Sequence, residues 1–350
     1  MKVTISLLNY NKKKYLPYCL DSVLQQSHQD LEIFFVDNAS SDSSFEYLKS
    51  YAEHKYPLAK INFIRNQENL GYSKAHNEVI KKATGEFIFC LNPDIILNKD
   101  YIKNCLEILM QNPKMGAITG KLFKWDFAQN TKTNIIDSCG HRILKTHRII
   151  EWGSNQKDSP EFETIKKIFS VSGAAPIYRK EALESIKFKI PQNSKNNSQT
   201  FENKFEYFDE SFFAYKEDID LSWRLLHAGW EIWFDHKSHA WHDRWETGTG
   251  ETALKTAEQR NKKSDLINKL SYRNHLLLLY KNEFASNFLI YFPWIFFYEL
   301  GKFFYTLFRE PKNLSAIIEL FKLCKLTKAK RNAIIKNSKI KPKDIRKYIY

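Results

Sequence analysis

The first ninety residues alternate between strand-like and helix-like segments, and this alternation restricts the fold more than any other feature. Short apolar runs suited to buried strands are separated by segments with apolar residues at helical spacing. Strands are predicted over residues 3–8, 31–36, 60–64 and 87–91, and helices over 16–24, 44–52 and 73–83. Short connections between such segments predict an α/β fold with a mostly parallel central sheet flanked by helices and right-handed crossovers.

Polar residues follow three of these strands: Asn9, Asp37, and Asn92 with Asp94. Pro93 ends the last strand, because proline has no amide hydrogen for the ladder. The carboxyl ends of parallel strands share one edge, where open α/β sheets bind ligands. Asp94 beside an amide suits a divalent cation that holds a phosphate group, and Asp37 suits a ribose or base edge. A solvated turn at residues 92–94 and a helix cap at Asp37 are the alternatives.

Two well-known phosphate-binding motifs are absent. The first strand is not followed by the glycine fingerprint of a dinucleotide fold, and the chain has no Walker A loop. Further along, a helix is predicted over 100–110, a strand over 116–123, and hairpin-like runs between 124 and 151. The small residues around Gly173 would let the backbone approach a ligand, or would allow tight packing. Residues 187–207 are polar and of low complexity, which indicates a surface insertion.

Acidic residues begin the predicted helix over 219–227, which Gly229 ends. The helix dipole favours ionised carboxylates at Glu217 and Asp218, and an ionised carboxylate at the rim of a site is a candidate general base. Helix capping is the alternative. His242 follows a strand predicted over 230–234, and is either a packed imidazole or a metal ligand.

The basic charge is concentrated in the tail. The formal net charge is +14, and residues 301–350 hold 14 Lys and Arg against three Asp and Glu, so the tail predicts an anionic partner. The five cysteines are scattered, which predicts reduced thiols in a cytosolic setting and no cysteine zinc site. The amino-terminal segment is too short and polar for a signal peptide.

An aromatic, apolar stretch precedes the basic tail. Its uncharged run, Phe284 to Tyr298, has 15 residues, fewer than the roughly 20 that a spanning helix needs. An in-plane helix at an anionic membrane surface is predicted, with packing on the catalytic domain or on a dimer partner as the alternative. The predicted division is a catalytic domain over 1–265 and a helical, basic region over 266–350.

Seven segments, taken in order, resemble the family 2 glycosyltransferases with the GT-A fold and, within them, the rhamnosyltransferase-like branch of bacterial surface-polysaccharide enzymes. Each segment is modest alone, but their order across residues 1–245 is specific. They are residues 3–11 ending in Asn9-Tyr10-Asn11, Val36-Asp37-Asn38-Ala39-Ser40-Ser41-Asp42, Asn69-Leu70-Gly71-Tyr72 with Asn77, Leu91-Asn92-Pro93-Asp94, Ser172-Gly173-Ala174, Phe208-Asp209-Glu210 through Arg224, and His242.

The resemblance implies a role for each site residue. Asp218 is implied as the catalytic base, Asp94 and His242 as ligands of Mg²⁺ or Mn²⁺, and Glu217, Arg224 and Trp245 as active-site or acceptor rim. The residues implied to bind the nucleotide sugar are Asn9, Asp37, Asn69, Gly71, Asn92, Asp94 and Gly173. The chain departs from the family pattern where Asn92 replaces the first Asp of Asp-x-Asp, where Ser43 replaces a frequent Gly, and in the long insertion. The composition of residues 244–252 also predicts a lid.

The activity implied is inverting transfer of a sugar, with rhamnose favoured, from a dTDP- or UDP-sugar to a polyprenyl-linked glycan acceptor. The predicted location is the cytoplasmic face of the cell membrane, with no nucleic-acid partner. Two other functions stay open: a catalytically silent scaffold that binds a nucleotide sugar, and a basic nucleic-acid-binding protein. The second rests on tail charge alone, without an RNA-binding or helix-turn-helix motif.

Overall fold

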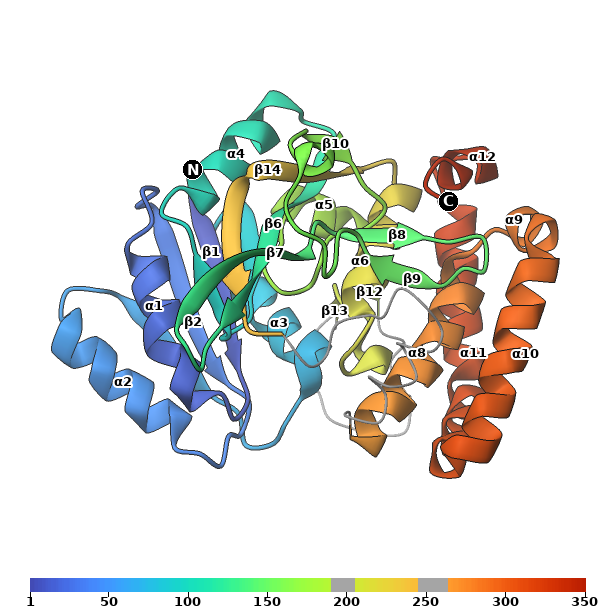
Figure 1. Ribbon diagram of the computed structural model, residues 1–350, viewed down its shortest axis with the longest axis horizontal. Helices are drawn as coiled ribbons and strands as arrows, with labels where there is room; N and C mark the ends of the chain where they lie inside the picture. The colour runs from blue at the N-terminus through green and yellow to red at the C-terminus, as the bar shows by residue number, and fades with distance from the viewer. Residues whose placement is uncertain (190–204, 245–263) are drawn as a thin grey trace, which may run out of the picture.

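A ten-stranded sheet forms the centre of the molecule (Figure 1). The computed structural model describes residues 1–189, 205–244 and 264–350. The strands of the sheet are β1 (Val3–Asn9), β2 (Leu31–Asp37), β3 (Ile61–Arg65), β4 (Phe87–Leu91), β5 (Ile95–Leu97), β6 (Met115–Asp126), β7 (Thr131–Ser138), β10 (Lys166–Lys167), β11 (Ile177–Arg179) and β14 (Glu231–His242). Their main order is β10-β14-β6-β11-β4-β1-β2-β3, with β5 on β14 and β7 on β6.

Most strands of this sheet run in one direction, while β5, β7, β10 and β11 run antiparallel to their neighbours. β1 pairs in parallel with β2 and β4, β2 with β3, and β6 with β14. The short β11 lies antiparallel between β4 and β6 and joins the two parallel halves. The predicted α/β class with a mostly parallel sheet is therefore confirmed.

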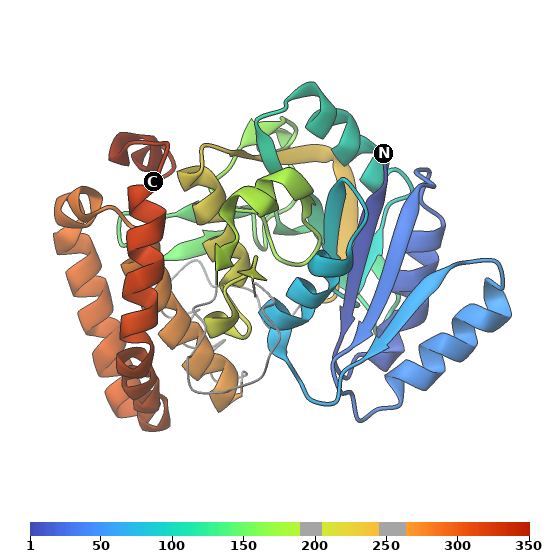
Figure 2. The ribbon, with the colours of Figure 1, turned by 180° about the vertical axis from the view of Figure 1, so that it is seen from behind.

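Helices cover both faces of the sheet. α1 (Leu16–Leu24), α2 (Ser44–Lys55) and α4 (Tyr101–Gln111) pack into one hydrophobic cluster, and Pro17 lies in the first turn of α1 as predicted. α3 (Gly71–Lys82), α5 (Lys180–Ile186) and α6 (Glu217–His227) cover the other face, which Figure 2 shows from behind. The elements predicted within the first ninety residues are all present.

Antiparallel strands form where hairpin-like runs were predicted between residues 124 and 151. β7 pairs with β6, and β8 (His141–Ile143) forms a hairpin with β9 (Ile149–Glu151). The described ends of the predicted insertion pair as β12 (Phe188–Lys189) and β13 (Phe205–Glu206), while residues 190–204 lie outside the described residues.

The C-terminal region is helical, as predicted, and lies beside α6 at the end of the molecule away from α2 (Figures 1 and 2). It contains α8 (Asp265–Asn282), α9 (Ala285–Ile290), α10 (Phe292–Arg309), α11 (Ser315–Lys336) and α12 (Pro342–Arg346). Leu277, Leu278 and Leu279 of α8 join the same buried cluster as α6, so the core continues across the boundary predicted at residue 265. Within the described part of the chain, no helix has the length and apolar character needed to span a bilayer.

Candidate active site

Asn9 and Asp37 meet at the carboxyl ends of β1 and β2. They are register partners, and Asn9 Nδ2 donates to Asp37 Oδ2 at 2.8 Å and to Ser40 Oγ at 3.0 Å. Asp37 Oδ1 accepts the Ser40 amide at 2.9 Å. Asn9 Oδ1 is buried and has no hydrogen-bond partner among the described residues. Ser43, not Asp37, is the N-cap residue of α2, so the capping alternative for Asp37 does not hold.

Asn69 and Gly71 shape the start of α3. Asn69 Oδ1 accepts the Asn38 side-chain amide at 2.8 Å and the Gly71 amide at 2.9 Å. Gly71 has φ +73°, and a Cβ atom there would lie 2.5 Å from the Phe213 carbonyl oxygen. Glycine is therefore required at this turn for both its backbone conformation and the space it leaves.

Asn92 and Asp94 follow β4, at the same edge of the sheet. The Asn92 amide donates to the Ala174 carbonyl at 2.9 Å, which ties this turn to the segment containing Gly173. Asp94 is buried, with Lys12 Nζ 3.3 Å from Oδ2 and His242 Nε2 3.4 Å from Oδ1. Burial would raise the pKa of the Asp94 carboxyl, but the charges of His242 and Lys12 hold it well below its usual range.

His242 lies between two carboxylates at the end of β14. Its Nδ1 is 2.9 Å from Asp137 Oδ2, and its Nε2 faces Asp94. Burial would lower the pKa of His242, but the negative charges of Asp94 and Asp137 raise it to about 9. Arg244 extends the network by binding Asp137 at 3.1 Å and Glu151 at 2.7 Å. Asp137, Glu151 and the site contact of Lys12 were missed by the sequence reasoning.

Asp94 and His242 have the chemistry of a partial divalent-metal site. Asp94 Oδ1 is buried without a hydrogen-bond partner in the part of the chain that the structure describes. His242 Nε2 faces that same oxygen, and a metal ion held by these two groups would replace the Nε2 proton, while Asp137 orients the ring through Nδ1 as in metal-binding histidines. No group of three or more His, Cys, Asp or Glu residues among those described could hold a metal ion. Of the described residues, Asp94 and His242 are therefore the two candidate ligands.

Asp218 is fixed by backbone amides at the N-terminus of α6. Its Oδ2 accepts the Gly173 amide at 2.7 Å, and its Oδ1 accepts the Ile219 amide at 2.8 Å. A Cβ atom on Gly173 would lie 2.9 Å from Asp218 Oδ2, so the small residue permits this close approach. Because residue 174 contacts residue 92, Asp218 lies on the strand-end side of the sheet near the Asn92–Asp94 turn.

Glu217 differs from the expectation of two ionised carboxylates at this helix start. Burial, together with the negative charge of Asp218, raises the pKa of Glu217 well above its usual range. Its Oε2 is buried and has no hydrogen-bond partner among the residues described. The raised pKa of Glu217 favours the protonated form of this carboxyl, whereas both oxygens of the neighbouring Asp218 accept backbone amides.

The structure does not bring Arg224, a predicted rim residue, to the site. Arg224 is fully buried, donates to Asp220 at 2.9 Å and to the Ile186 carbonyl at 3.1 Å, and faces the ring of Phe188. These contacts give it a packing role and offer no support for a place on a rim. Trp245, and the predicted lid beyond Arg244, lie outside the described residues.

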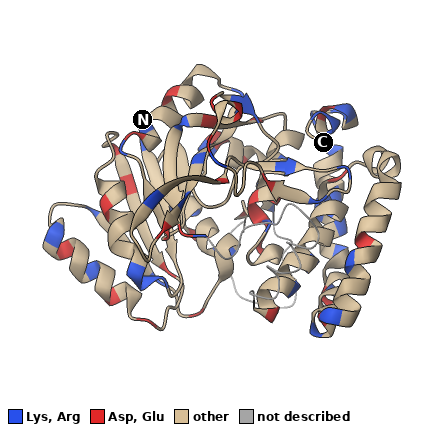
Figure 3. Cartoon of the chain, in the orientation of Figure 1, with Lys and Arg blue, Asp and Glu red and all other residues tan. Residues whose placement is uncertain are grey.

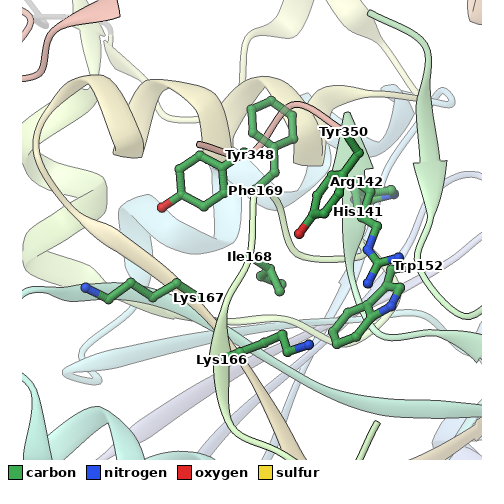
Figure 4. A pocket seen from close by; sticks show the side chains of 9 residues that line it. All are labelled: His141, Arg142, Trp152, Lys166, Lys167, Ile168, Phe169, Tyr348 and Tyr350. Carbon is green, nitrogen blue, oxygen red and sulfur yellow. The ribbon is translucent and has the colours of Figure 1, made fainter. Parts of the chain in front are cut away.

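A small surface hollow lies apart from these residues (Figure 4). Arg142 and Lys166 both lie over the ring of Trp152 at its wall. None of the predicted site residues lines it. The candidate site is instead the polar edge built by the ends of β1, β2, β4 and β14 with the start of α6.

Comparisons with known proteins agree on one family. The family model described as "Glycosyl transferase family 2" matches residues 4–187. A poly-beta-1,6-N-acetyl-D-glucosamine synthase of Staphylococcus epidermidis is 25% identical over 240 residues, covering 68% of this chain and 49% of that protein. Glycosyltransferase GlyA of Streptococcus pneumoniae is 23% identical over 222 residues, covering 61% of this chain and 30% of that protein. The chain thus spans half or less of the length of these curated relatives.

Solved structures show the same fold. GalNAc-T7, crystallised with UDP, GalNAc and Mn²⁺, has a TM-score of 0.59 at 12% identity, covering 82% of this chain and 49% of that one. The mannosyltransferase PcManGT of Pyrobaculum calidifontis, in complex with GDP-Man and Mn²⁺, has a TM-score of 0.50 at 16% identity, covering 99% and 82%. Both are glycosyltransferases, and the predicted GT-A fold is confirmed. With more than half of its residues matched by the family model, the chain belongs to glycosyl transferase family 2.

Proposed function

We propose that this chain transfers a sugar, with inversion, from a nucleoside-diphosphate donor to a hydroxyl group of a glycan acceptor in cell-surface polysaccharide synthesis. One observation carries the proposal. Asp94, with a buried oxygen free of hydrogen bonds within the described residues, and Asp218, held on the Gly173 amide, lie on the same strand-end side of the sheet. A carboxylate such as Asp94 would hold the cation that the diphosphate leaving group needs. A carboxylate such as Asp218 would take the proton of the acceptor hydroxyl.

Asp94 and His242 would hold Mg²⁺ or Mn²⁺ in this proposal. The unbonded Asp94 oxygen and the adjacent imidazole support it, as do the Mn²⁺ ions in the solved structures of GalNAc-T7 and PcManGT. A divalent cation would offset the negative charge that develops on the diphosphate as the glycosidic bond breaks. Lys12, 3.3 Å from Asp94, adds a second positive charge at the same place.

Asp218 would take the proton from the acceptor hydroxyl as its oxygen attacks the anomeric carbon. Each carboxylate oxygen of Asp218 accepts one backbone amide and keeps a further lone pair for this proton. The two amides hold the group in place, so little reorganisation accompanies the transfer. Bond formation to the acceptor oxygen and departure of the nucleoside diphosphate on the opposite face then complete one displacement.

Asn9, Asp37, Asn69 and Gly71 would contact the nucleotide of the donor. Their convergence at the ends of β1 and β2 supports this assignment, and the unbonded Asn9 Oδ1 is available for a donor hydroxyl. Rhamnose from a dTDP donor is the first candidate, from the resemblance of the motifs. The staphylococcal synthases add N-acetylglucosamine as a candidate, and the PcManGT complex adds GDP-mannose.

The test is thermal unfolding with a panel of nucleotide sugars, with and without Mn²⁺. Specific binding to the folded state raises the midpoint by mass action. We expect one donor to raise it in the presence of Mn²⁺, and the Asp94→Ala variant to lose that shift. Asp30→Ala is the control, because Asp30 precedes β2 at the opposite edge and its side chain is half exposed. No shift with any donor would contradict the proposal.

Turnover then tests the assignment of the base. Asp218→Asn should keep the donor-induced shift and reduce transfer by about 10²–10⁴-fold, as expected when a general base is lost. Wild-type turnover in this variant would reject Asp218 as the base. Donor binding without transfer by the wild-type chain, tried with several lipid-linked glycans, would favour the silent scaffold.

We further propose that the C-terminal helices rest on the cytoplasmic face of the membrane. Large apolar side chains project from α9, α10 and α11, with Leu289, Phe297, Phe308 and Phe321 each at least 70% exposed. Lys and Arg residues line α11 and α12 beside them (Figure 3). An apolar helix face next to a net charge of +11 in the tail suits an anionic lipid surface. The five free cysteines are consistent with a reducing compartment.

Sedimentation with lipid vesicles tests this location. We expect binding to vesicles rich in phosphatidylglycerol, weaker binding to phosphatidylcholine alone, and release by salt. Replacing Phe297 and Phe308 by serine should abolish binding. Leu58→Ser should leave binding unchanged, because Leu58 is 94% exposed but lies in the α2–β3 connection and not on the C-terminal helices. Equal loss in both variants, or preferential binding to RNA, would overturn the membrane proposal.

A further inference from the structure

The backbone that leads into α6 adopts conformations that residues with side chains rarely take. Phe213, Tyr215 and Lys216 have φ angles of +63°, +72° and +71°, and none of them is glycine. Phe213, with ψ −67°, is the centre of a γ-turn closed by the Ala214 amide on the Phe212 carbonyl at 2.7 Å. This form of γ-turn is rare and strained. Such a segment persists only where surrounding contacts hold it.

Asn274 of α8 supplies those contacts. Its side chain is fully buried, and Nδ2 donates to the carbonyl oxygens of Phe212 at 2.9 Å, Ala214 at 2.8 Å and Tyr215 at 2.7 Å. Two amide hydrogens serve three acceptors, so the bonds are shared. One side chain from the C-terminal region therefore holds the strained segment at three points.

Arg273 fixes the orientation of that amide. Its Nε donates to Asn274 Oδ1 at 3.0 Å, so the Asn274 NH₂ group faces the segment. Its Nη2 donates to the Ser211 carbonyl at 2.9 Å and the Phe212 carbonyl at 3.2 Å, and its Nη1 pairs with Glu319 of α11 at 2.7 Å. The arginine is thereby anchored on α11 while it orients the asparagine.

The same segment connects both halves of the candidate site. The Phe213 carbonyl accepts the amides of Tyr72 at 2.7 Å and Ser73 at 3.2 Å, in the first turn of α3 after Gly71. The Tyr72 hydroxyl donates to the Gly173 carbonyl at 2.7 Å, and the Gly173 amide donates to Asp218. Lys216, the last residue of the segment, is the N-cap of the helix that carries Asp218. A shift of the segment would therefore move Asp218 relative to α3 and the residues proposed to bind the nucleotide sugar.

We propose that Asn274, oriented by Arg273, is a positioning residue that sets the place of Asp218 for proton transfer. It touches neither donor nor acceptor in this proposal, and acts through the backbone of residues 212–216. The inference rests on the proposed function, because it takes Asp218 as the base.

The test compares two asparagines of α8 in the full chain. Asn282 is also fully buried, but it donates to Asp220 at 2.8 Å and the Leu278 carbonyl at 3.2 Å, not to the strained segment. Asn274→Ala should lower kcat by about 10–100-fold, because displacing a catalytic group by about 1 Å has costs of this order. Asn282→Ala should keep kcat within about twofold of the wild-type value. The two variants should lose Tm equally, since each removes one buried side-chain amide. Equal kcat losses, or an unchanged kcat in Asn274→Ala, would overturn the proposal.

A second comparison separates this inference from the proposed function. In the Asp218→Asn background, Asn274→Ala should cause little further loss, because a residue that acts only by placing the base has nothing left to place. Full additivity of the two losses rejects the positioning role and leaves Asp218 as the base. An Asp218→Asn variant with wild-type turnover rejects both. Should Asn274→Ala not fold, Arg273→Lys keeps a charge for Glu319 but loses the bond to Asn274 Oδ1, and should show a smaller kcat loss in the same direction.

Discussion

At the scale of single residues, His76 makes the fold sensitive to acid. Its ring is fully buried in α3, with Nδ1 2.7 Å from Ser6 Oγ and Nε2 without a hydrogen-bond partner among the described residues. Burial lowers the pKa of His76 to about 3. As the pH falls below 6.5, His76 takes up a proton in the unfolded chain but not in the folded chain. The contribution of the neutral ring to the free energy of unfolding is therefore fully present above pH 6.5 and declines as the pH falls toward 3.

The prediction is a loss of about 2 kcal/mol in the free energy of unfolding between pH 7 and pH 5 from this one group. Urea unfolding at the two pH values measures it. His76→Asn keeps a partner for Ser6 and cannot titrate, so its stability should fall less over the same interval by that amount. Equal pH dependence in variant and wild type would show that His76 takes up its proton as readily in the folded chain as in the unfolded chain between pH 7 and pH 5.

Gly71 and Gly301 form a contrasting pair of glycines. Alanine at Gly71 would need φ +73° and would collide with the Phe213 carbonyl, so Gly71→Ala should cost at least about 2 kcal/mol and weaken donor binding. Gly301 lies within α10, and no atom of the described residues comes within 4 Å of an added Cβ, so Gly301→Ala should add about 0.5–1 kcal/mol to the free energy of unfolding. Chemical unfolding of both variants checks the opposite signs. Destabilisation by both would point to a general intolerance of helix changes.

Residues next to regular elements were easier to predict than their partners. Asp94 follows a buried strand and a proline, and both signals are local. Asp137 and Glu151 contact the site from β7 and β9, where the sequence shows no clear period. Their function depends on contacts with residues about a hundred positions later, which no local pattern reports. Arg224 was predicted at the rim from its position in a motif. That position carried no information on burial, and the side chain is buried.

At the scale of elements, buried charges join α8 and α11 to the loop before α6. Lys281 is fully buried, with its Nζ 2.5 Å from Asp209 Oδ2 and 2.7 Å from Asp220 Oδ1. Lys330 of α11 approaches the other Asp209 oxygen at 2.7 Å. Removing one member of a buried ion network leaves charge without compensation, which costs more than the intact pair contributes.

Lys281→Met should therefore cost about 3–5 kcal/mol in urea unfolding. Lys312→Met is the matched control, since that lysine is 84% exposed and lies 3.5 Å from Asp265, which is itself 71% exposed. It should leave the midpoint unchanged, because exposed pairs contribute little. A Lys281→Met protein as stable as the control would mean that the carboxylates of this cluster are neutral in the folded chain.

Strand pairing limited what could be predicted for the sheet. The four amino-terminal strands are spaced as successive strand–helix units, so periodicity and short connections were sufficient. β11 has only three residues and runs antiparallel between β4 and β6, which no composition signal marks. β14 continues to His242, well beyond the apolar run that predicted its start, because it pairs with both β6 and β5. Those partners lie more than a hundred residues earlier in the chain.

At the scale of the whole molecule, the C-terminal helices and the central sheet share one core. Leu278 of α8 is fully buried in the cluster that includes α6 and α3. Leu278→Ala should destabilise by about 2–5 kcal/mol and shift a single calorimetric transition of the whole chain. Leu289→Ala, at a side chain 71% exposed, should not. Two separate transitions, with only one shifted, would show that residues 266–350 unfold independently.

The hold of α8 on residues 211–216 has a consequence for building hybrid enzymes. The family model ends at residue 187, so a splice there would look natural for exchanging donor preference between relatives. In such a hybrid, the strained segment and the C-terminal helices would come from one parent protein. The α3 amides that bind this segment would come from the other parent, so the two surfaces need not fit. A cut within the strained segment would be worse. Functional hybrids of this chain should instead inherit residues 206–350 as one block, together with the first turn of α3, whose amides bind the Phe213 carbonyl.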